Sequence, residues 1–187
     1  MNHLTFLEGR KYTKRCDLVK RIADQIDNNA NNEGISHIKA ITDYIASLHN
    51  DVSRKEKEYR KRTAAEILFT GYQNGCTDRA LSFIVLSREL GIPTRYVETL
   101  QEEWLKNKDF SGKIQGHVFT DVFFDNQWVI YDPLSGFSEA YAIEERGDYV
   151  VIGKGLDFSE LYVPGRKIPI SIGSIDSLRE IAKKISF

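Results

Sequence analysis

The stretch NGCTDRALSFIVLSRELGIP, residues 74–93, is the part of the chain from which the rest can be interpreted. Its apolar residues recur at helical spacing and are numerous enough to cover most of the circumference of a helix. Asn74 is a suitable N-cap at its start, and Gly91 followed by Pro93 is typical of a helix stop. The stretch therefore predicts a central and buried helix.

Three further helical patterns precede this stretch. Apolar residues spaced three and four apart predict helices over about 14–27, 35–48 and 63–69. The polar run 28–34 is interpreted as a break between the first two helices. The densely charged segment 53–62 carries both signs, so we interpret it as solvated surface.

After residue 93 the period of the pattern changes from helical to alternating. Strands are predicted at residues 94–100, 116–124, 127–131, 149–152 and 160–163, followed by a closing helix at 174–185. Asp125-Asn126 is a tight-turn signal between two of these strands. The order predicts an α+β protein in which a helical N-terminal part and the central helix pack on an antiparallel sheet. We expect one domain, residues 1–187, with a core at about 35–165 and the first and last helices as extensions.

Composition excludes several classes of protein. The chain has 187 residues, of which 41% are hydrophobic and 28% charged, and its formal net charge is −1. Near-neutral charge gives no sign of a nucleic-acid binder or of a polybasic membrane anchor. No stretch approaches the roughly 20 apolar residues of a transmembrane helix, and the N-terminus lacks the apolar run of a signal peptide. We expect a cytoplasmic protein with no nucleic-acid or membrane partner, whose oligomeric state the sequence leaves open.

Cys76 stands out by its position at the start of the central helix. The chain has two cysteines, which excludes a disulfide-rich scaffold, and Cys16 is interpreted as packing on the apolar stripe of the first helix. Unpaired amides and partial positive charge at a helix N-terminus favour a thiolate and can hold the oxyanion of a tetrahedral intermediate. Asp78 in the same turn acts against the thiolate. The alternative is an inert buried thiol, since cysteine often serves as a small hydrophobe.

A thiol nucleophile needs a base, and His117 is the best placed of the four histidines. The other three lie at the N-terminus or near the ends of a predicted helix and are interpreted as surface residues: His3, His37 and His49. The turn at residues 125–126 places His117 opposite about residue 134, with Asp132 close by. An acid beside an imidazole on adjacent strands is what a Cys-His-Asp arrangement requires. Taken singly, a strand histidine and an Asp-Pro turn each have a structural alternative.

Several stretches together resemble the transglutaminase-like superfamily, which has a papain-like thiol fold in circularly reordered form. The match covers about residues 60–135, and the order Cys, His, Asp is that of the family. The matching stretches are TAAEIL at 63–68, GCTD at 75–78 followed by Ala80-Leu81, RELGIPTRY at 88–96, Gly116-His117, and NQWVIYDP at 126–133.

The resemblance implies a role for each candidate site residue. Cys76 is expected to be the nucleophile, His117 the general base and then acid, and Asp132 the orienting group. An acyl-thioester would form from an amide and be resolved by an amine or by water. The amide of Cys76 would hold the oxyanion with a second donor, for which Tyr72 and Gln73 are the nearest candidates. Gly75 would let a substrate carbonyl approach the backbone.

The sequence also departs from relatives that use metals. It contains nothing like the spaced acids of a calcium loop, and the paired-cysteine zinc motif of peptide N-glycanases is absent. We therefore expect no metal and no cofactor. The expected partner is a protein, a peptide or a small amide substrate, with hydrolysis slightly favoured over amine transfer. The alternative is a non-catalytic binding protein, or one directed at a small metabolite, that retains the fold.

Overall fold

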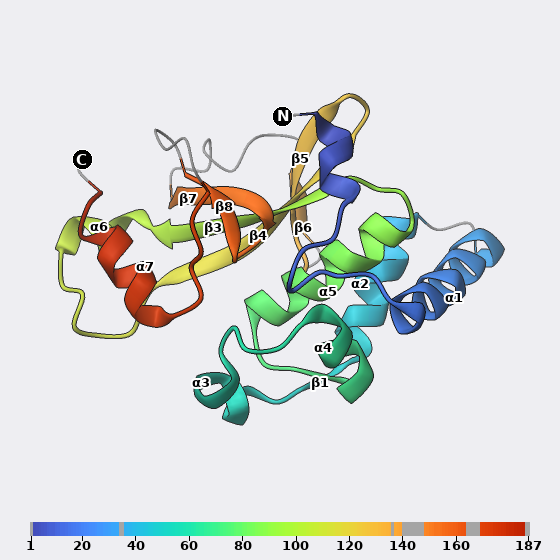
Figure 1. Ribbon diagram of the computed structural model, residues 1–187, viewed down its shortest axis with the longest axis horizontal. Helices are drawn as coiled ribbons and strands as arrows, with labels where there is room; N and C mark the ends of the chain where they lie inside the picture. Colours follow the sequence, from blue (N-terminus) through green and yellow to red (C-terminus); the bar gives the residue numbers. More distant parts are fainter. Residues whose placement is uncertain (1, 34–35, 136, 140–147, 164–168, 186–187) are drawn as a thin grey trace.

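A twisted antiparallel sheet forms one layer of the molecule (Figure 1). The computed structural model describes residues 2–33, 36–135, 137–139, 148–163 and 169–185. Within these ranges the sheet has the order β6-β5-β4-β3-β7-β8. Its strands are β3 (Thr94–Gln101), β4 (Gly116–Phe124), β5 (Gln127–Asp132), β6 (Phe137–Glu139), β7 (Tyr149–Asp157) and β8 (Glu160–Tyr162). A separate parallel pair consists of β1 (His49–Asn50) and β2 (Tyr72–Gln73).

Helices form the second layer, and α5 (Cys76–Glu89) lies at its centre. Helix α5 contacts β3 and β4 on one side and α1, α2 and α4 on the other, as Figure 1 shows. The remaining helices are η1 (His3–Leu7), α1 (Asp17–Glu33), α2 (His37–Ser47), η2 (Val52–Arg54), α3 (Lys55–Glu58), α4 (Ala64–Thr70), α6 (Glu102–Asn107) and α7 (Ile175–Ala182). The predicted α+β arrangement is therefore confirmed.

The central helix is buried, as its apolar circumference predicts. Residues from Ala80 to Arg88 are all buried, which accounts for the low polarity of this segment on every side. The predicted N-cap is wrong by one residue, since Gly75 occupies the N-cap position and its φ of 151° is unfavourable for residues with a side chain. The amide of Asn74 instead donates to Asp78, which holds the chain in place just before the helix.

The β4–β5 hairpin has the predicted register. Asp125 and Asn126 both adopt positive φ, as the tight turn of a two-residue hairpin requires. Pairing then runs from Phe124 opposite Gln127 to Thr120 opposite Tyr131. Beyond Thr120 the two strands separate, because β4 continues beside β3 and Asp132 pairs with β6.

The structure corrects two sequence-based boundaries and adds one helix that was not predicted. The polar run 28–34 does not end the first helix, because Ala30 continues the buried stripe and α1 extends to Glu33. Ile35, where the second helix was expected to begin, lies outside the described residues. Strand β7 reaches Asp157, five residues beyond the predicted end, and a helix, α6, occupies part of a segment without a predicted element.

The charged segment 53–62 is not uniformly solvated, contrary to expectation. Arg60 is 3% exposed, and its guanidinium donates to both carboxylate oxygens of Glu98 at 2.6 and 2.7 Å. The same side chain donates to the carbonyl of Ile172. A buried guanidinium requires such partners, and through these two contacts Arg60 connects the helical half to the sheet and to the C-terminal segment.

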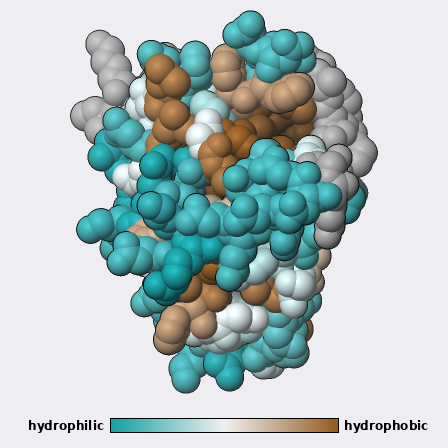
Figure 2. All heavy atoms as spheres, turned by 90° about the vertical axis from the view of Figure 1, so that its right-hand side faces the viewer, coloured by the Kyte–Doolittle hydropathy of each residue, from teal (hydrophilic) through white to brown (hydrophobic). Residues whose placement is uncertain are grey.

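The outer face on which α1 lies is mainly hydrophilic across its middle (Figure 2). This distribution agrees with the sequence of α1, whose apolar stripe turns inward and whose other residues are charged or polar. Among the described residues, none of the helices combines the length and apolarity that a membrane span requires.

Candidate active site

Cys76 is the first residue of α5 and is half-buried. Its N-cap, Gly75, has no side chain, and within the described part of the chain no side-chain capping hydrogen bond is formed at this end of the helix. Space before Cys76 is restricted, since a Cβ placed on Gly75 would lie 3.3 Å from both Cε and Nζ of Lys55. The thiol therefore lies at the positive end of the helix dipole and close to the ammonium group of Lys55.

His117 is the second residue of β4 and is fixed by its neighbours on the sheet. Its carbonyl accepts a hydrogen bond from the Thr99 hydroxyl at 2.8 Å, and its ring packs edge-on against Phe119 with centroids 4.6 Å apart. Gly116 allows the strand to approach β3, because a Cβ there would lie 2.5 Å from the Thr99 carbonyl oxygen. These contacts determine where the imidazole can point.

Asp132 ends β5 and binds the imidazole of His117. Its Oδ2 lies 3.0 Å from Nε2 of His117, which leaves Nδ1 as the ring nitrogen free to serve the thiol. The carboxylate also accepts hydrogen bonds from the Leu134 amide at 2.8 Å and the Ser135 hydroxyl at 3.0 Å. Asp132 is thus held in position from two sides, and it orients the ring.

The electrostatics of these groups favour a thiolate beside an imidazolium. Burial alone would raise the pKa of Cys76, but hydrogen bonding and charge from His117, with a contribution from Lys55, lower it below its usual value. Burial acts to lower the pKa of His117, yet the hydrogen bonds with Asp132 and Cys76 raise it to about 9. Burial likewise opposes ionisation of Asp132, and the bond from His117 nevertheless lowers its pKa.

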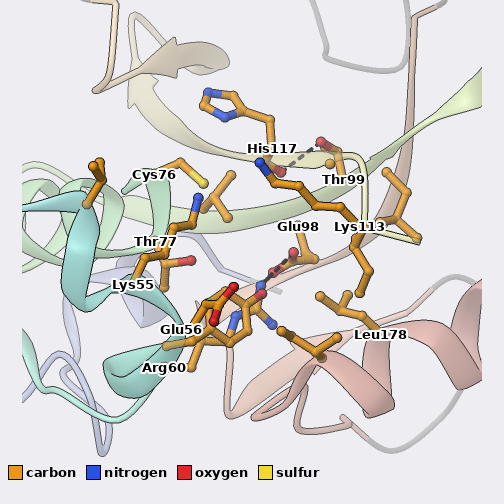
Figure 3. A pocket seen from close by; sticks show the side chains of 17 residues that line it. Lys55, Glu56, Arg60, Cys76, Thr77, Glu98, Thr99, Lys113, His117 and Leu178 are labelled. Atoms are coloured by element: carbon orange, nitrogen blue, oxygen red, sulfur yellow. Dashed lines mark hydrogen bonds and ion pairs between the residues drawn. The ribbon is translucent and has the colours of Figure 1, made fainter. Parts of the chain in front are cut away.

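Cys76 and His117 both line a cavity of about 440 Å³ (Figure 3). Its floor includes the buried Arg60–Glu98 pair, and its apolar wall includes Ile114 together with Ile175 and Leu178 of α7. A volume of this size accommodates a small molecule or a short peptide segment. The C-terminal helix, expected to be an extension of the core, therefore forms part of the cavity wall.

The two expected side-chain oxyanion donors have other partners. The amide group of Gln73 is buried and donates to the carbonyl of Ile45 at 3.0 Å. The hydroxyl of Tyr72 donates to Glu58 at 2.8 Å. Neither residue is among those that line the cavity. Cys76 and Thr77, the first two residues of α5, do line the cavity.

Asp78 does not leave an uncompensated charge beside the thiol. Its carboxylate forms an ion pair with Arg62 and accepts the amide of Asn74 at 3.0 Å. The concern that this acid would disfavour the thiolate is therefore reduced.

Sequence reasoning missed the three cationic residues of the cavity, Lys55, Arg60 and Lys113, and its two carboxylates, Glu56 and Glu98. The three cations lie in polar segments without apolar periodicity, so no local pattern distinguishes them from surface residues. Cys16, expected to pack in the core, is instead exposed and precedes α1.

Comparisons with known proteins found a similar fold and a matching family model. A search among curated proteins found no match. The fold is similar to that of a crystal structure described as a "putative cysteine protease" from Cytophaga hutchinsonii, with a TM-score of 0.54 and 19% sequence identity. The alignment covers 94% of this chain and 60% of that one, so the chain spans less than two thirds of its neighbour's length.

The family model that matches is that of the transglutaminase-like superfamily, and it covers residues 20–133. This range includes Cys76, His117 and Asp132 and more than half of the chain. The superfamily is of the papain-like thiol-enzyme kind, as the sequence resemblance implied. The chain therefore belongs to the transglutaminase-like superfamily.

Proposed function

We propose that the protein is a thiol enzyme that cleaves or transfers the acyl group of an amide through a thioester on Cys76. The observation that carries this proposal is that Cys76 and His117 both line the cavity while Asp132 lies 3.0 Å from the imidazole of His117. A nucleophile, a base and an orienting acid are the groups that acyl transfer requires.

In the first half-reaction, the Cys76 thiolate attacks the amide carbonyl and forms a carbon–sulfur bond. The carbonyl electron pair moves onto oxygen, where the amide of Cys76 at the start of α5 donates to it. As the tetrahedral intermediate collapses, the carbon–nitrogen bond breaks and His117 gives its proton to the leaving amine. The acyl group then remains as a thioester.

In the second half-reaction, His117 is neutral and takes a proton from water or from an incoming amine. The nucleophile attacks the thioester, the carbon–sulfur bond breaks, and the thiolate is regenerated beside the imidazolium. Asp132 binds Nε2 in both halves, which leaves Nδ1 as the ring nitrogen that exchanges the proton. Hydrolysis gives a carboxylic acid, and transfer to an amine gives a new amide.

Activity of wild-type protein and of the Cys76→Ala variant on a panel of peptide amides tests the proposal. Each substrate is assayed with and without an added primary amine, and the products are identified by mass spectrometry. We expect a carboxylic acid without the amine, and loss of all products in the variant. Turnover that persists in Cys76→Ala, or a wild type inert toward every amide, would favour a non-catalytic binding protein with this fold.

A further inference from the structure

Two lysine side chains enter the cavity beside the nucleophile. Lys55 belongs to α3, and Lys113 lies between α6 and β4. In Figure 3 they extend into the cavity from opposite sides, toward the end where Cys76 and His117 lie. Across the part of the chain that the structure describes, neither ammonium group forms an ion pair with a carboxylate.

The other charged groups of the cavity do not neutralise these lysines. Glu98 is 3% exposed and is occupied by Arg60, which donates to both of its oxygens. Glu56 lies at the exposed rim. Apart from the Cys76–His117 pair, the lining therefore carries three cations against two carboxylates and has a net positive charge.

The position of Lys55 relates this charge to the reacting atoms. Its Nζ would lie 3.3 Å from a Cβ on Gly75, the residue that precedes the nucleophile. The charge of Lys55 also contributes to the lowered pKa of Cys76. A group bound between the two lysines would consequently be next to the scissile bond of a substrate attacked by Cys76.

The rest of the lining is mostly apolar. Leu100, Ile114, Val118, Ile175 and Leu178 line the cavity, and the lysines are the cations in it that have no carboxylate partner among the described residues. Lys55 is half-buried and Lys113 is exposed, and an ammonium group beside an apolar lining attracts a carboxylate more strongly than one in open solvent. A neutral substrate would leave both without a partner.

We propose that Lys55 and Lys113 select an acyl donor that carries a carboxylate next to the scissile amide, such as an acidic peptide. This inference rests on the proposed role of Cys76 as nucleophile. The lysines are specificity-determining residues: they bind the carboxylate, and the chemistry remains with Cys76, His117 and Asp132.

A pair of alkylating reagents that differ in charge tests the inference. Iodoacetate and iodoacetamide both react by attack of the thiolate on the CH₂ carbon, which forms a carbon–sulfur bond and expels iodide. The ratio of their rates at Cys76 cancels the reactivity of the thiolate and reports the electrostatic preference for a carboxylate. Mass spectrometry of the tryptic peptides separates Cys76 from Cys16, and the Cys16 ratio serves as an internal reference.

Variants Lys55→Gln and Lys113→Gln are compared with Lys57→Gln and Lys108→Gln. The second pair removes the same charge from exposed residues outside the cavity lining. We expect the wild-type ratio at Cys76 to exceed that at Cys16. It should fall by about fivefold in each cavity variant, the effect of one partly exposed charge pair, and stay unchanged in the controls.

The salt dependence of labelling is measured on the wild-type protein, so this test holds even if a variant fails to fold. Raising the salt concentration from roughly 20 mM to 500 mM should lower the iodoacetate rate at Cys76 and leave the iodoacetamide rate nearly constant, because salt screens the charges.

The outcomes separate the substrate class from the proposed function. Rapid iodoacetamide labelling of Cys76 with a ratio insensitive to salt and to both cavity variants would overturn the substrate class alone. Labelling of Cys76 by either reagent no faster than that of Cys16 would overturn the nucleophile, and with it both proposals.

Discussion

The two ends of α5 have opposite environments. Near the C-terminal end, Arg88 is 1% exposed, and its guanidinium donates to backbone carbonyls of Glu8, Thr94 and Leu156 and to the hydroxyl of Thr13. At the N-terminal end, no side chain caps the helix and Cys76 borders a cavity. Through Arg88, one end ties distant segments of the chain together, whereas the other borders the cavity without a side-chain cap. Stability and reactivity should therefore be separable by mutation.

The largest effect is expected at the C-terminal end. Arg88→Met removes five hydrogen bonds and leaves buried carbonyl oxygens without donors. The free energy of unfolding should fall by about 3–5 kcal/mol, measured by urea denaturation, as for other broken buried networks. Arg21→Met, at an exposed residue of α1, is the control. An unchanged free energy of unfolding in Arg88→Met would contradict the proposal that the C-terminal end of α5 anchors the fold.

At the N-terminal end, His117→Ala should lower the reactivity of the Cys76 thiol. Without the imidazole, burial raises the pKa of the Cys76 thiol. Iodoacetamide labelling of Cys76 at pH 7 should slow by roughly 100-fold, since an ordinary thiol is only a few per cent ionised there. The exposed His49→Ala serves as control, and Cys16 should react at an unchanged rate in both variants. Equal labelling of Cys76 with and without His117 would remove the imidazole from the mechanism.

Asp132→Asn should have a smaller effect on the same end. The carboxylate is one of the groups that raise the pKa of His117 to about 9, so its removal lowers the pKa of the imidazolium. Labelling of Cys76 should slow by about tenfold, because one hydrogen-bonded carboxylate typically shifts a pKa by a unit or more. Asp125→Asn removes the same charge from the hairpin turn, where asparagine tolerates the positive φ. An equal decrease of the Cys76 labelling rate in both variants would show that the rate depends on net charge and not on the orientation of His117 by Asp132.

The smallest effect is expected for Cys16→Ser. Cys16 is exposed and lies before α1, so the free energy of unfolding should change by less than about 0.5 kcal/mol. Activity on amides should also be unchanged. A large loss of stability would show that Cys16 packs in the core, as the sequence alone predicted.

The sequence predicted the parts of the site that depend on local signals. Cys76 follows from a helix start, and the proximity of His117 and Asp132 follows from a two-residue turn whose register fixes the hairpin. The fold class follows from the change of period after residue 93. These features are determined by residues that are close together in the sequence, and they can therefore be predicted from a single sequence.

The remainder depends on long-range partners. Arg60 lies in a segment with the composition of solvated surface, and it is buried because Glu98 neutralises it from β3. Likewise, α1 continues through a run of weak helix formers because Ala30 packs on the core, so tertiary contacts override propensity. The contribution of α7 to the cavity cannot be predicted without knowing where the C-terminal segment returns.

The pH dependence of iodoacetamide labelling at Cys76, with Cys16 measured in the same sample, tests the central claim most directly. The pKa of Cys76 is lowered and that of His117 is raised to about 9, so the thiolate–imidazolium pair should persist up to the pH at which His117 deprotonates. We predict that Cys76 is labelled much faster than Cys16 at pH 7 and that its rate varies little between pH 7 and 8. A Cys76 rate that equals that of Cys16 and rises in parallel with it over this range would contradict the account.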